Sequence, residues 1–383
     1  MSFSRRTFVK GLSSLTLLGS PFASLRAAQL KKRNLVVIML RGGLDGLDAV
    51  PAIDPLLSAA RPDISLSESK KITSDFLLHP SLKAFHELWN ENKAAVVHST
   101  NIPYTHRSHF EGQNLMETGG LSPYADDTGW LGRGMEAAEL EGLAVSLPMP
   151  LLLRGNIDRD NLFPSNFGWM KPPNPQYLRA ALQSADLDSP IYEAMRKVNQ
   201  RDHGAMMKFQ GKNGAGELAP IAAEQLANKY GPRVAVFEIS GFDTHAAQGG
   251  SGGTLAQYIG ELDSVIEGLR NNLGDEFDNT LILTLTEFGR RLDQNGGFGT
   301  EHGYGTAILM AGGLVKSSQV FADWPGLSTK ELFEGQDLNA TIDARAVYCS
   351  AMSACFDIDF TYMRRKAFWN HELPDLTEKL FRV

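Results

Sequence analysis

Residues 280–313, TLILTLTEFGRRLDQNGGFGTEHGYGTAILMAGG, contain the pattern that decides the fold. The run at 280–286 is apolar and β-branched but too short for a helix, which predicts a strand buried on both faces. A glycine-rich polar loop follows it, and residues 306–311 predict a second strand. The loop carries Glu287 and His302 close to a strand's carboxyl end. Ligands bind at that edge of open α/β sheets, so we expect the active site there.

Two further apolar runs end in polar side chains. Residues 34–40 and 233–239 each predict a buried strand, and a helical pattern at 255–269 joins the second run to the strand at 280–286. A strand, a helix and a strand in this order form a right-handed unit with parallel strands, so their carboxyl ends share one edge. The side chains that we expect at this edge are Asp45, Asp243, His245, Glu287 and His302.

A set of carboxylate and imidazole groups at one edge indicates a metal site. Oxygen and nitrogen ligands suit Zn²⁺ or Mn²⁺ best, and Ca²⁺ or Mg²⁺ are alternatives. The competing interpretation is a hydrogen-bonded polar network without a metal. In that interpretation, Asp45 is a turn residue or a helix cap.

A second polar segment follows a predicted strand at 94–98. Ser108 and Glu111 form an S-x-x-E capping box, which predicts a helix that starts at Ser108. The positive end of a helix also favours a bound phosphate or sulfate and stabilises an alkoxide, so Ser108 is a candidate nucleophile. Arg107 and His109 add charge-assisted donors and a candidate general acid.

The first residues predict export. Ser4-Arg5-Arg6-Thr7-Phe8 is a twin-arginine motif, and a short apolar run follows it. We therefore expect a signal peptide over 1–28, recognised by the twin-arginine (Tat) translocation machinery, and a periplasmic or secreted protein. The remaining residues 29–383 are predicted to form a single domain with a less regular insertion at about 137–230.

Composition excludes several classes of protein. The chain has 383 residues, a net charge of -7 and a pI near 5.8, which give no support for nucleic-acid binding. No long apolar run follows the leader, so we expect no transmembrane segment in the mature protein. The two cysteines, Cys349 and Cys355, are predicted to be buried thiols without a disulfide.

Five motifs, in order along the chain, resemble the exported bacterial family called domain of unknown function 1501 (DUF1501). They are Arg41-Gly-Gly-Leu-Asp-Gly-Leu47, Arg107-Ser-His-Phe-Glu-Gly-Gln113, Gly241-Phe-Asp-Thr-His245, Thr286-Glu-Phe-Gly-Arg290 and Gly299-Thr-Glu-His-Gly303. That family in turn resembles the alkaline phosphatase and sulfatase superfamily. The resemblance implies a three-layer α/β/α sandwich with a mostly parallel central sheet. It also implies a nucleophile at a helix start and one or two metals.

The resemblance assigns residues only in part. It implies metal ligands at Asp45, Asp243, His245 and His302. The Asp-His pair of the superfamily becomes Glu287-Phe288 here, so one imidazole ligand is missing. Counting back from Thr118 places the nucleophile at His109, with Ser108 one residue earlier.

The function that follows is metal-dependent hydrolysis of a phosphate or sulfate ester, with a small anionic substrate. Ser108, His109 or a metal-bound water is the candidate attacking group, and Arg107, Arg290 or Arg41 would bind the anionic oxygens. The alternative is a non-catalytic exported binding or assembly protein that keeps the fold and a structural metal.

Overall fold

The computed structural model describes residues 33–146, 148–157, 159–161, 214–369 and 371–383. The predicted signal peptide at 1–28 and residues 162–213 of the predicted insertion lie outside the described residues. No helix in the described ranges is long and apolar enough to cross a membrane.

A nine-stranded sheet forms the centre of the protein, with the order β12-β4-β11-β8-β1-β7-β5-β6 and with β13 beside β4. Among the described strands of this sheet, only β11 runs antiparallel to its neighbours, so the prediction of a mostly parallel sheet is confirmed. The strands are β1 (Asn34–Arg41), β4 (Ala94–Asn101), β5 (Gly142–Val145), β6 (Arg159–Asn161), β7 (Val234–Ser240), β8 (Thr280–Leu285), β11 (Thr306–Ala311), β12 (Val320–Phe321) and β13 (Ile342–Asp343).

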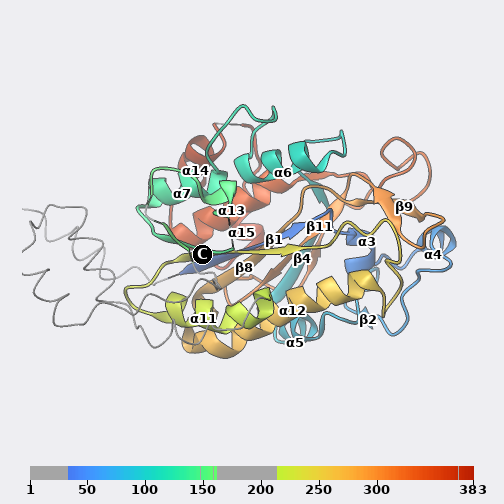
Figure 1. Cartoon of the computed structure of the whole chain (residues 1–383), viewed down its shortest axis with the longest axis horizontal. Coiled ribbons are helices and arrows are strands. Elements are labelled where there is room, and N and C mark those ends of the chain that lie inside the picture. Colours follow the sequence, from blue (N-terminus) through green and yellow to red (C-terminus); the bar gives the residue numbers. More distant parts are fainter. Residues whose placement is uncertain (1–32, 147, 158, 162–213, 370) are drawn as a thin grey trace, which may run out of the picture.

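Helices cover both faces of this sheet (Figure 1). The first face carries α6 (His109–Thr118), α7 (Trp130–Ala138), α13 (Ala344–Phe356), α14 (Phe360–Ala367) and α15 (Thr377–Leu380). The second carries α5 (Lys83–Asn90), α11 (Ala215–Ala227) and α12 (Thr254–Leu273). Successive side chains of β1 alternate between the two cores, because strand residues point to opposite faces. The three-layer α/β/α sandwich is thereby confirmed.

The strand order differs in one respect from a sheet in which two strands joined by a helix are direct neighbours. β7 and β8 are parallel, as predicted, but β1 lies between them and pairs with both. The described parts of the range 137–230 contribute to the sandwich, since β5 and β6 extend the sheet and α11 covers it. Cys349 and Cys355 are buried free thiols on α13, which confirms that prediction.

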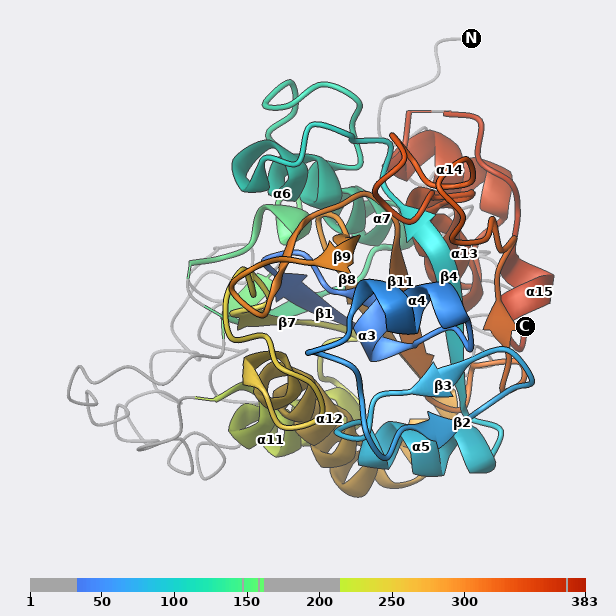
Figure 2. The ribbon, with the colours of Figure 1, turned by 90° about the vertical axis from the view of Figure 1, so that its right-hand side faces the viewer.

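Short elements gather at the edge where β1, β7 and β8 end (Figure 2). These are α3 (Gly46–Ala49), α4 (Pro55–Ala60) and the hairpin of β9 (Arg290–Gln294) and β10 (Thr300–His302). The remaining short elements are β2 (Lys70–Lys71), β3 (Leu77–Leu78) and the 3₁₀ turns η2 (Leu151–Leu153) and η4 (Gly274–Asn279). The loops at this edge therefore bring distant segments of the chain together.

Candidate metal centre

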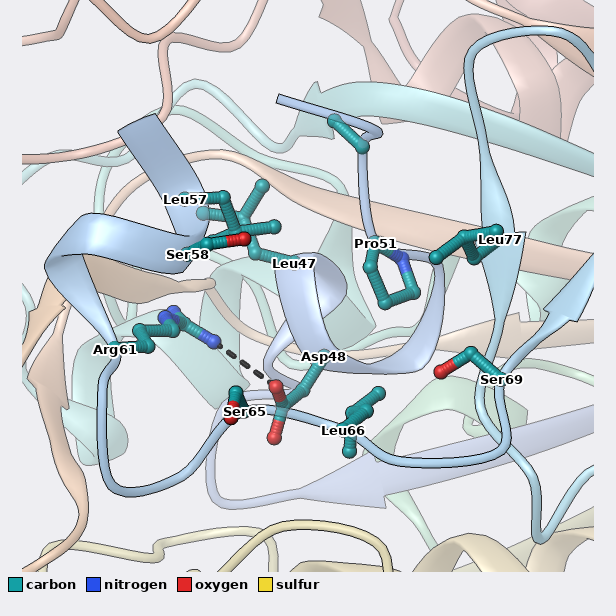
Figure 3. A pocket seen from close by; sticks show the side chains of 11 residues that line it. Leu47, Asp48, Pro51, Leu57, Ser58, Arg61, Ser65, Leu66, Ser69 and Leu77 are labelled. Carbon is teal, nitrogen blue, oxygen red and sulfur yellow. Dashed lines mark hydrogen bonds and ion pairs between the residues drawn. The ribbon is translucent and has the colours of Figure 1, made fainter. Parts of the chain in front are cut away.

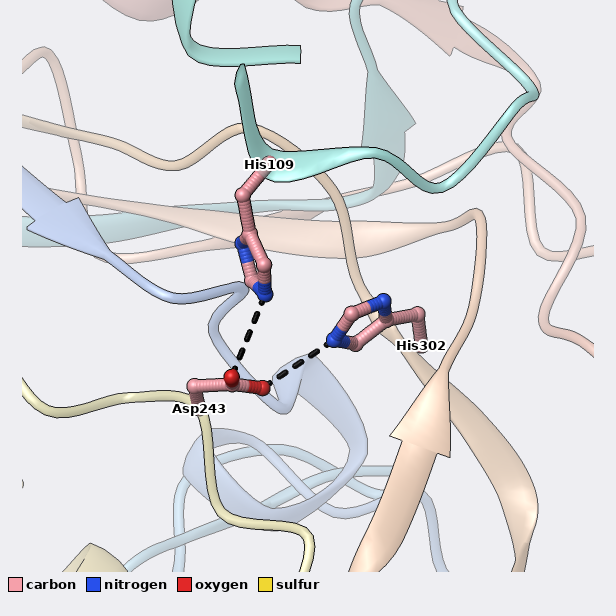
Figure 4. Close-up of side chains that lie close together, drawn as sticks. All are labelled: His109, Asp243 and His302. Atoms are coloured by element: carbon pink, nitrogen blue, oxygen red, sulfur yellow. Dashed lines mark hydrogen bonds and ion pairs between the residues drawn. The ribbon is translucent and has the colours of Figure 1, made fainter. Parts of the chain in front are cut away.

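Three imidazoles surround the carboxylate of Asp243, which follows β7. The Nε2 atoms of His245 and His302 each lie 3.0 Å from its Oδ1, and His109 Nε2 lies 3.2 Å from Oδ2. His109 is the first residue of α6 and His302 ends β10. Figure 4 shows the rings of His109 and His302 directed at Asp243 from two separate elements.

The other nitrogen of each imidazole faces a group that accepts hydrogen bonds. The acceptors of Nδ1 are Glu287 Oε1 for His109 at 2.9 Å, Glu301 Oε2 for His245 at 3.0 Å and the Arg107 carbonyl for His302 at 3.0 Å. A carbonyl or an ionised carboxylate cannot donate, so Nδ1 carries the proton in each ring. In the neutral imidazoles, the lone pair of Nε2 then points at Asp243.

This arrangement fits a divalent cation. A nitrogen lone pair and a carboxylate oxygen that lie about 3 Å apart repel each other unless a proton or a cation lies between them. His109 Nε2 is buried and makes no hydrogen bond with any of the described residues. The ligand atoms of His109, Asp243 and His302 all lie within 4.8 Å of one another, and His245 Nε2 lies 2.9 Å from His302 Nε2. Imidazoles that donate Nδ1–H to a carboxylate or carbonyl are typical of metal ligands, and the donor set suits Zn²⁺ or Mn²⁺.

The cluster is open to solvent on one side. The side chain of Asp243 is 43% exposed and that of His245 is 39% exposed, whereas His109 and His302 are 25% and 21% exposed. Burial lowers the pKa of His302, which favours the neutral ring that a metal requires. A small molecule could therefore approach the ligand atoms from the side of Asp243 and His245.

Glu287 supports His109 from behind. Its fully buried carboxylate accepts bonds from the Gly42 amide at 2.9 Å and from Gln113 Nε2 at 3.0 Å, besides the bond to His109. Burial raises the pKa of Glu287, but the bonds from His109 and Gln113 outweigh burial and lower it. The bond to Glu287 in turn raises the pKa of His109. Gly42 has φ +118°, and a Cβ there would lie 2.3 Å from the Asp243 nitrogen, so this turn requires glycine.

Arg290 is a buried cation next to Asp243. Its guanidinium contacts the Asp243 carboxylate at 2.6 Å and donates to the carbonyls of Gly42, Gly43, Phe242 and Thr300. Partial burial raises the pKa of Asp243, but the bond from Arg290 and its positive charge outweigh burial, and the pKa is lowered to about 2. Arg290 therefore keeps Asp243 ionised, and its guanidinium is buried.

The other two arginines predicted to bind an anion also have carboxylate partners. Arg41 lies 2.9 Å from Glu117 and 3.0 Å from Glu238. Arg107 contacts Asp337 at 2.6 Å. The structure thus places all three guanidiniums in ion pairs with residues of this chain.

Asp45 belongs to a different cluster. Its carboxylate contacts Arg61 at 2.8 Å and Gln248 at 2.8 Å, and it caps α3 by accepting from the Asp48 amide at 3.2 Å. Asp48 also contacts Arg61, beside a cavity of about 100 Å³ (Figure 3). Burial, followed by the charge of Asp45, raises the pKa of Asp48 to about 7. The carboxylate oxygens of Asp45 are therefore occupied by Arg61, Gln248 and the Asp48 amide. The bond from the Asp48 amide fits the alternative prediction, in which Asp45 is a helix cap.

Ser108 precedes α6, as predicted, but the capping box does not form. The Ser108 side chain makes no capping bond, and its amide donates to the Tyr104 hydroxyl at 3.1 Å. That hydroxyl donates to Glu111 at 2.8 Å and so replaces the expected direct contact. The capping-box prediction was wrong because a buried tyrosine supplies the bridging group. His109, the neighbour of Ser108, contacts Asp243.

Sequence reasoning missed the residues that support the histidines. Gln113 stands four residues after His109 on α6, a spacing that places both on one helix face and could have indicated it. Glu301 adjoins His302 in the sequence, but its contact with His245 depends on how the hairpin packs. Nothing local marks Asp337, which is far along the chain from Arg107.

The fold and the site define an α/β/α protein with a candidate metal centre at the carboxyl edge of its sheet. The chain belongs to the family described as "Protein of unknown function (DUF1501)", whose model matches residues 32–349, so the predicted resemblance is confirmed. A comparison with curated proteins finds no match.

The chain is also similar to several solved structures, all at low sequence identity. They include an alkaline phosphatase superfamily protein from Vibrio parahaemolyticus (9% identity, TM-score 0.43, 88% of this chain and 69% of that chain). Murine ectonucleotide pyrophosphatase/phosphodiesterase 5 has 9% identity and a TM-score of 0.42, over 91% of this chain and 100% of that chain. The soluble domain of lipooligosaccharide phosphoethanolamine transferase A from Neisseria meningitidis has 10% identity and a TM-score of 0.42, over 93% and 95%. At TM-scores below 0.5, this likeness says nothing about the activity of this chain.

Proposed function

We propose that this protein is a hydrolase of phosphate or sulfate esters that depends on one divalent metal. The ligands in this proposal are His109, Asp243, His245 and His302. The observation that carries it is that three Nε2 atoms face one carboxylate while each Nδ1 has an acceptor. A bound Zn²⁺ or Mn²⁺ would polarise an ester oxygen and lower the pKa of a water molecule.

The residues around the ligands orient and tune them. Glu287 holds the His109 ring through Nδ1, and Arg290 keeps Asp243 ionised. Water is the nucleophile in this proposal, because a bound metal would activate it and His109 Nε2 is directed at Asp243. The exposed side of Asp243 and His245 is where the ester would enter.

Charge limits the substrate that this site would favour. Asp243, Glu287 and Glu301 carry three negative charges near the site, and Arg290 carries one positive charge. A divalent ion would bring the sum to about zero, and the arginines predicted to bind an anion already have partners in this chain. Esters with one negative charge, such as phosphodiesters and sulfate esters, suit this site better than doubly charged phosphate monoesters.

A structural metal in a binding or assembly protein is the second candidate. One observation favours it: four protein ligands would complete a tetrahedral shell, as in structural zinc sites. The exposure of Asp243 and His245 favours the enzyme instead, because His245 can leave a coordination position to a substrate or water. The twin-arginine motif at Arg5-Arg6 supports export of the domain at 29–383 to the periplasm by the Tat route.

The test is metal content combined with ester turnover. We expect about one Zn²⁺ or Mn²⁺ per chain of purified protein, and a loss of the metal in Asp243→Asn. Asp293→Asn, an exposed carboxylate in the same hairpin as His302, is the matched control and should keep the metal. A phosphodiester and a sulfate ester should be hydrolysed at least about tenfold faster than the corresponding phosphate monoester. A metal-loaded protein that hydrolyses no ester would leave the binding protein as the better candidate.

A further inference from the structure

Arg107 has an unusual backbone conformation immediately before α6. Its φ is +59°, in the left-handed region that residues other than glycine rarely adopt. In this conformation its carbonyl accepts a bond from His302 Nδ1 at 3.0 Å. The main chain of Arg107 therefore contacts a candidate metal ligand, although its side chain points elsewhere.

A buried carboxylate holds the side chain of Arg107. Nε donates to Asp337 Oδ2 at 3.0 Å and Nη2 donates to the same oxygen at 2.6 Å. The Asp337 side chain is fully buried, whereas Glu334, the other partner of the guanidinium, is 54% exposed. Hydrogen bonds between charged groups are stronger when they are shielded from water, so the contact with Asp337 is the one that can fix the loop.

The two contacts of Arg107 form one chain of interactions. Asp337 fixes the guanidinium, and the guanidinium holds the backbone in a conformation that costs free energy. The carbonyl thus stays directed at His302, where it can only accept. His302 keeps its proton on Nδ1, and its Nε2 lone pair remains directed at Asp243.

We propose that Asp337 and the Arg107 guanidinium are positioning residues that hold His302 in the Nδ1–H tautomer needed for metal binding. This inference rests on the proposed metal-dependent function. It adds a residue of a distant loop to the support of the site. Asp337 touches neither the ligand atoms nor the solvent-exposed side of the cluster.

The test compares Asp337→Asn and Arg107→Met with Glu334→Gln. Methionine keeps the carbonyl, the Cβ and a long side chain but has no guanidinium, so Arg107→Met tests whether the guanidinium holds the left-handed backbone. Two properties are measured: the tautomer of His302, from ¹⁵N shifts of the metal-free protein, and the Zn²⁺ dissociation constant, from competition with a chelator. Both test variants should populate the Nε2–H tautomer of His302 and weaken Zn²⁺ binding by about 10- to 100-fold. Glu334→Gln should leave both properties unchanged, because its ion pair is exposed.

A purely structural role gives a different result. The midpoint of thermal unfolding would then fall in Asp337→Asn while the His302 tautomer and the Zn²⁺ dissociation constant stay at the wild-type values, which overturns the proposal. If Asp337→Asn does not fold, Arg107→Met decides by the same two measurements. If wild type binds neither Zn²⁺ nor Mn²⁺, the proposed function fails, and the tautomer of the metal-free variants still tests the positioning role.

Discussion

Two charged clusters lie at the carboxyl edge of the sheet, and they differ in how their carboxylates are neutralised. In the first cluster, Arg61 contacts both Asp45 and Asp48, and all three are almost fully buried. In the second, Asp243 is exposed and faces imidazole lone pairs. The first cluster contains its own cation within hydrogen-bond distance. In the second, Arg290 neutralises only part of the charge and leaves the side with the imidazoles open.

The difference shows that a carboxylate after a central strand is weak evidence for a metal. Asp45 and Asp243 follow the neighbouring strands β1 and β7. Their roles separate because a guanidinium saturates one of them, while the other retains an oxygen that faces unprotonated nitrogens. The groups behind the candidate ligands decide between these roles, as the Nδ1 acceptors do here.

The largest expected effect comes from removing the cation of the buried cluster. Arg61→Met leaves Asp45 and Asp48 buried without their counter-ion, which should cost about 3–5 kcal/mol of unfolding free energy. Urea unfolding followed by circular dichroism measures this loss. Arg61→Met combined with Asp45→Asn and Asp48→Asn should recover part of it, because no unpaired charge then remains. A loss below about 1 kcal/mol in Arg61→Met would show that the cluster is not held by its ion pairs.

The architecture could be predicted because its signals are local. The runs that form β1 and β8 are apolar on both faces, and such runs are typical of central parallel strands. The position of β1 between β7 and β8 could not be predicted, because it depends on pairing between distant segments. The antiparallel direction of β11 depends in the same way on how the hairpin of β9 and β10 returns the chain.

The candidate site could be predicted only in part, for a related reason. Asp243, His245 and His302 lie in short polar motifs near strand ends, and the structure brings them together. The partner of Asp45 was not predictable, because Arg61 reaches it only after α4 and a turn. The sequence makes His109 a candidate nucleophile, but the direction of its ring depends on Glu287, which is distant in sequence.

A smaller effect concerns the pH dependence of the buried cluster. The pKa of Asp48 is raised to about 7 in the folded state, mainly by burial, so the folded protein binds more protons than the unfolded chain between about pH 4 and pH 7. The contribution of Asp48 to stability is therefore present at low pH and is lost as the pH rises through about 7. Asp48→Asn should remove this loss, so its stability relative to wild type should rise by on the order of 1–2 kcal/mol between pH 5 and pH 8.

The pH profile of wild type must be compared with that of Asp48→Asn, because two buried histidines also make the stability depend on pH. Burial lowers the pKa of His79 and His98 to about 4, so these groups destabilise the fold as the pH falls below about 6.5. Their contribution is common to wild type and Asp48→Asn and cancels in the difference. Equal pH profiles of unfolding free energy for the two proteins would mean that Asp48 stays ionised across this range.

The smallest expected effect on stability concerns the starts of two helices at this edge, of which only one is capped by a side chain. Asp45 caps α3 with its side chain, but Ser108 makes no such bond at the start of α6. Ser108→Ala should therefore cost less than about 0.5 kcal/mol, below the 1 kcal/mol typical of a lost cap. Tyr104→Phe should cost more, on the order of 1 kcal/mol, because it removes the hydroxyl between the Ser108 amide and Glu111. Chemical denaturation of both variants measures this order, and ester turnover that survives Ser108→Ala would agree with water as the nucleophile. A Ser108→Ala protein that folds normally, keeps its metal and loses all turnover would instead identify Ser108 as the attacking group.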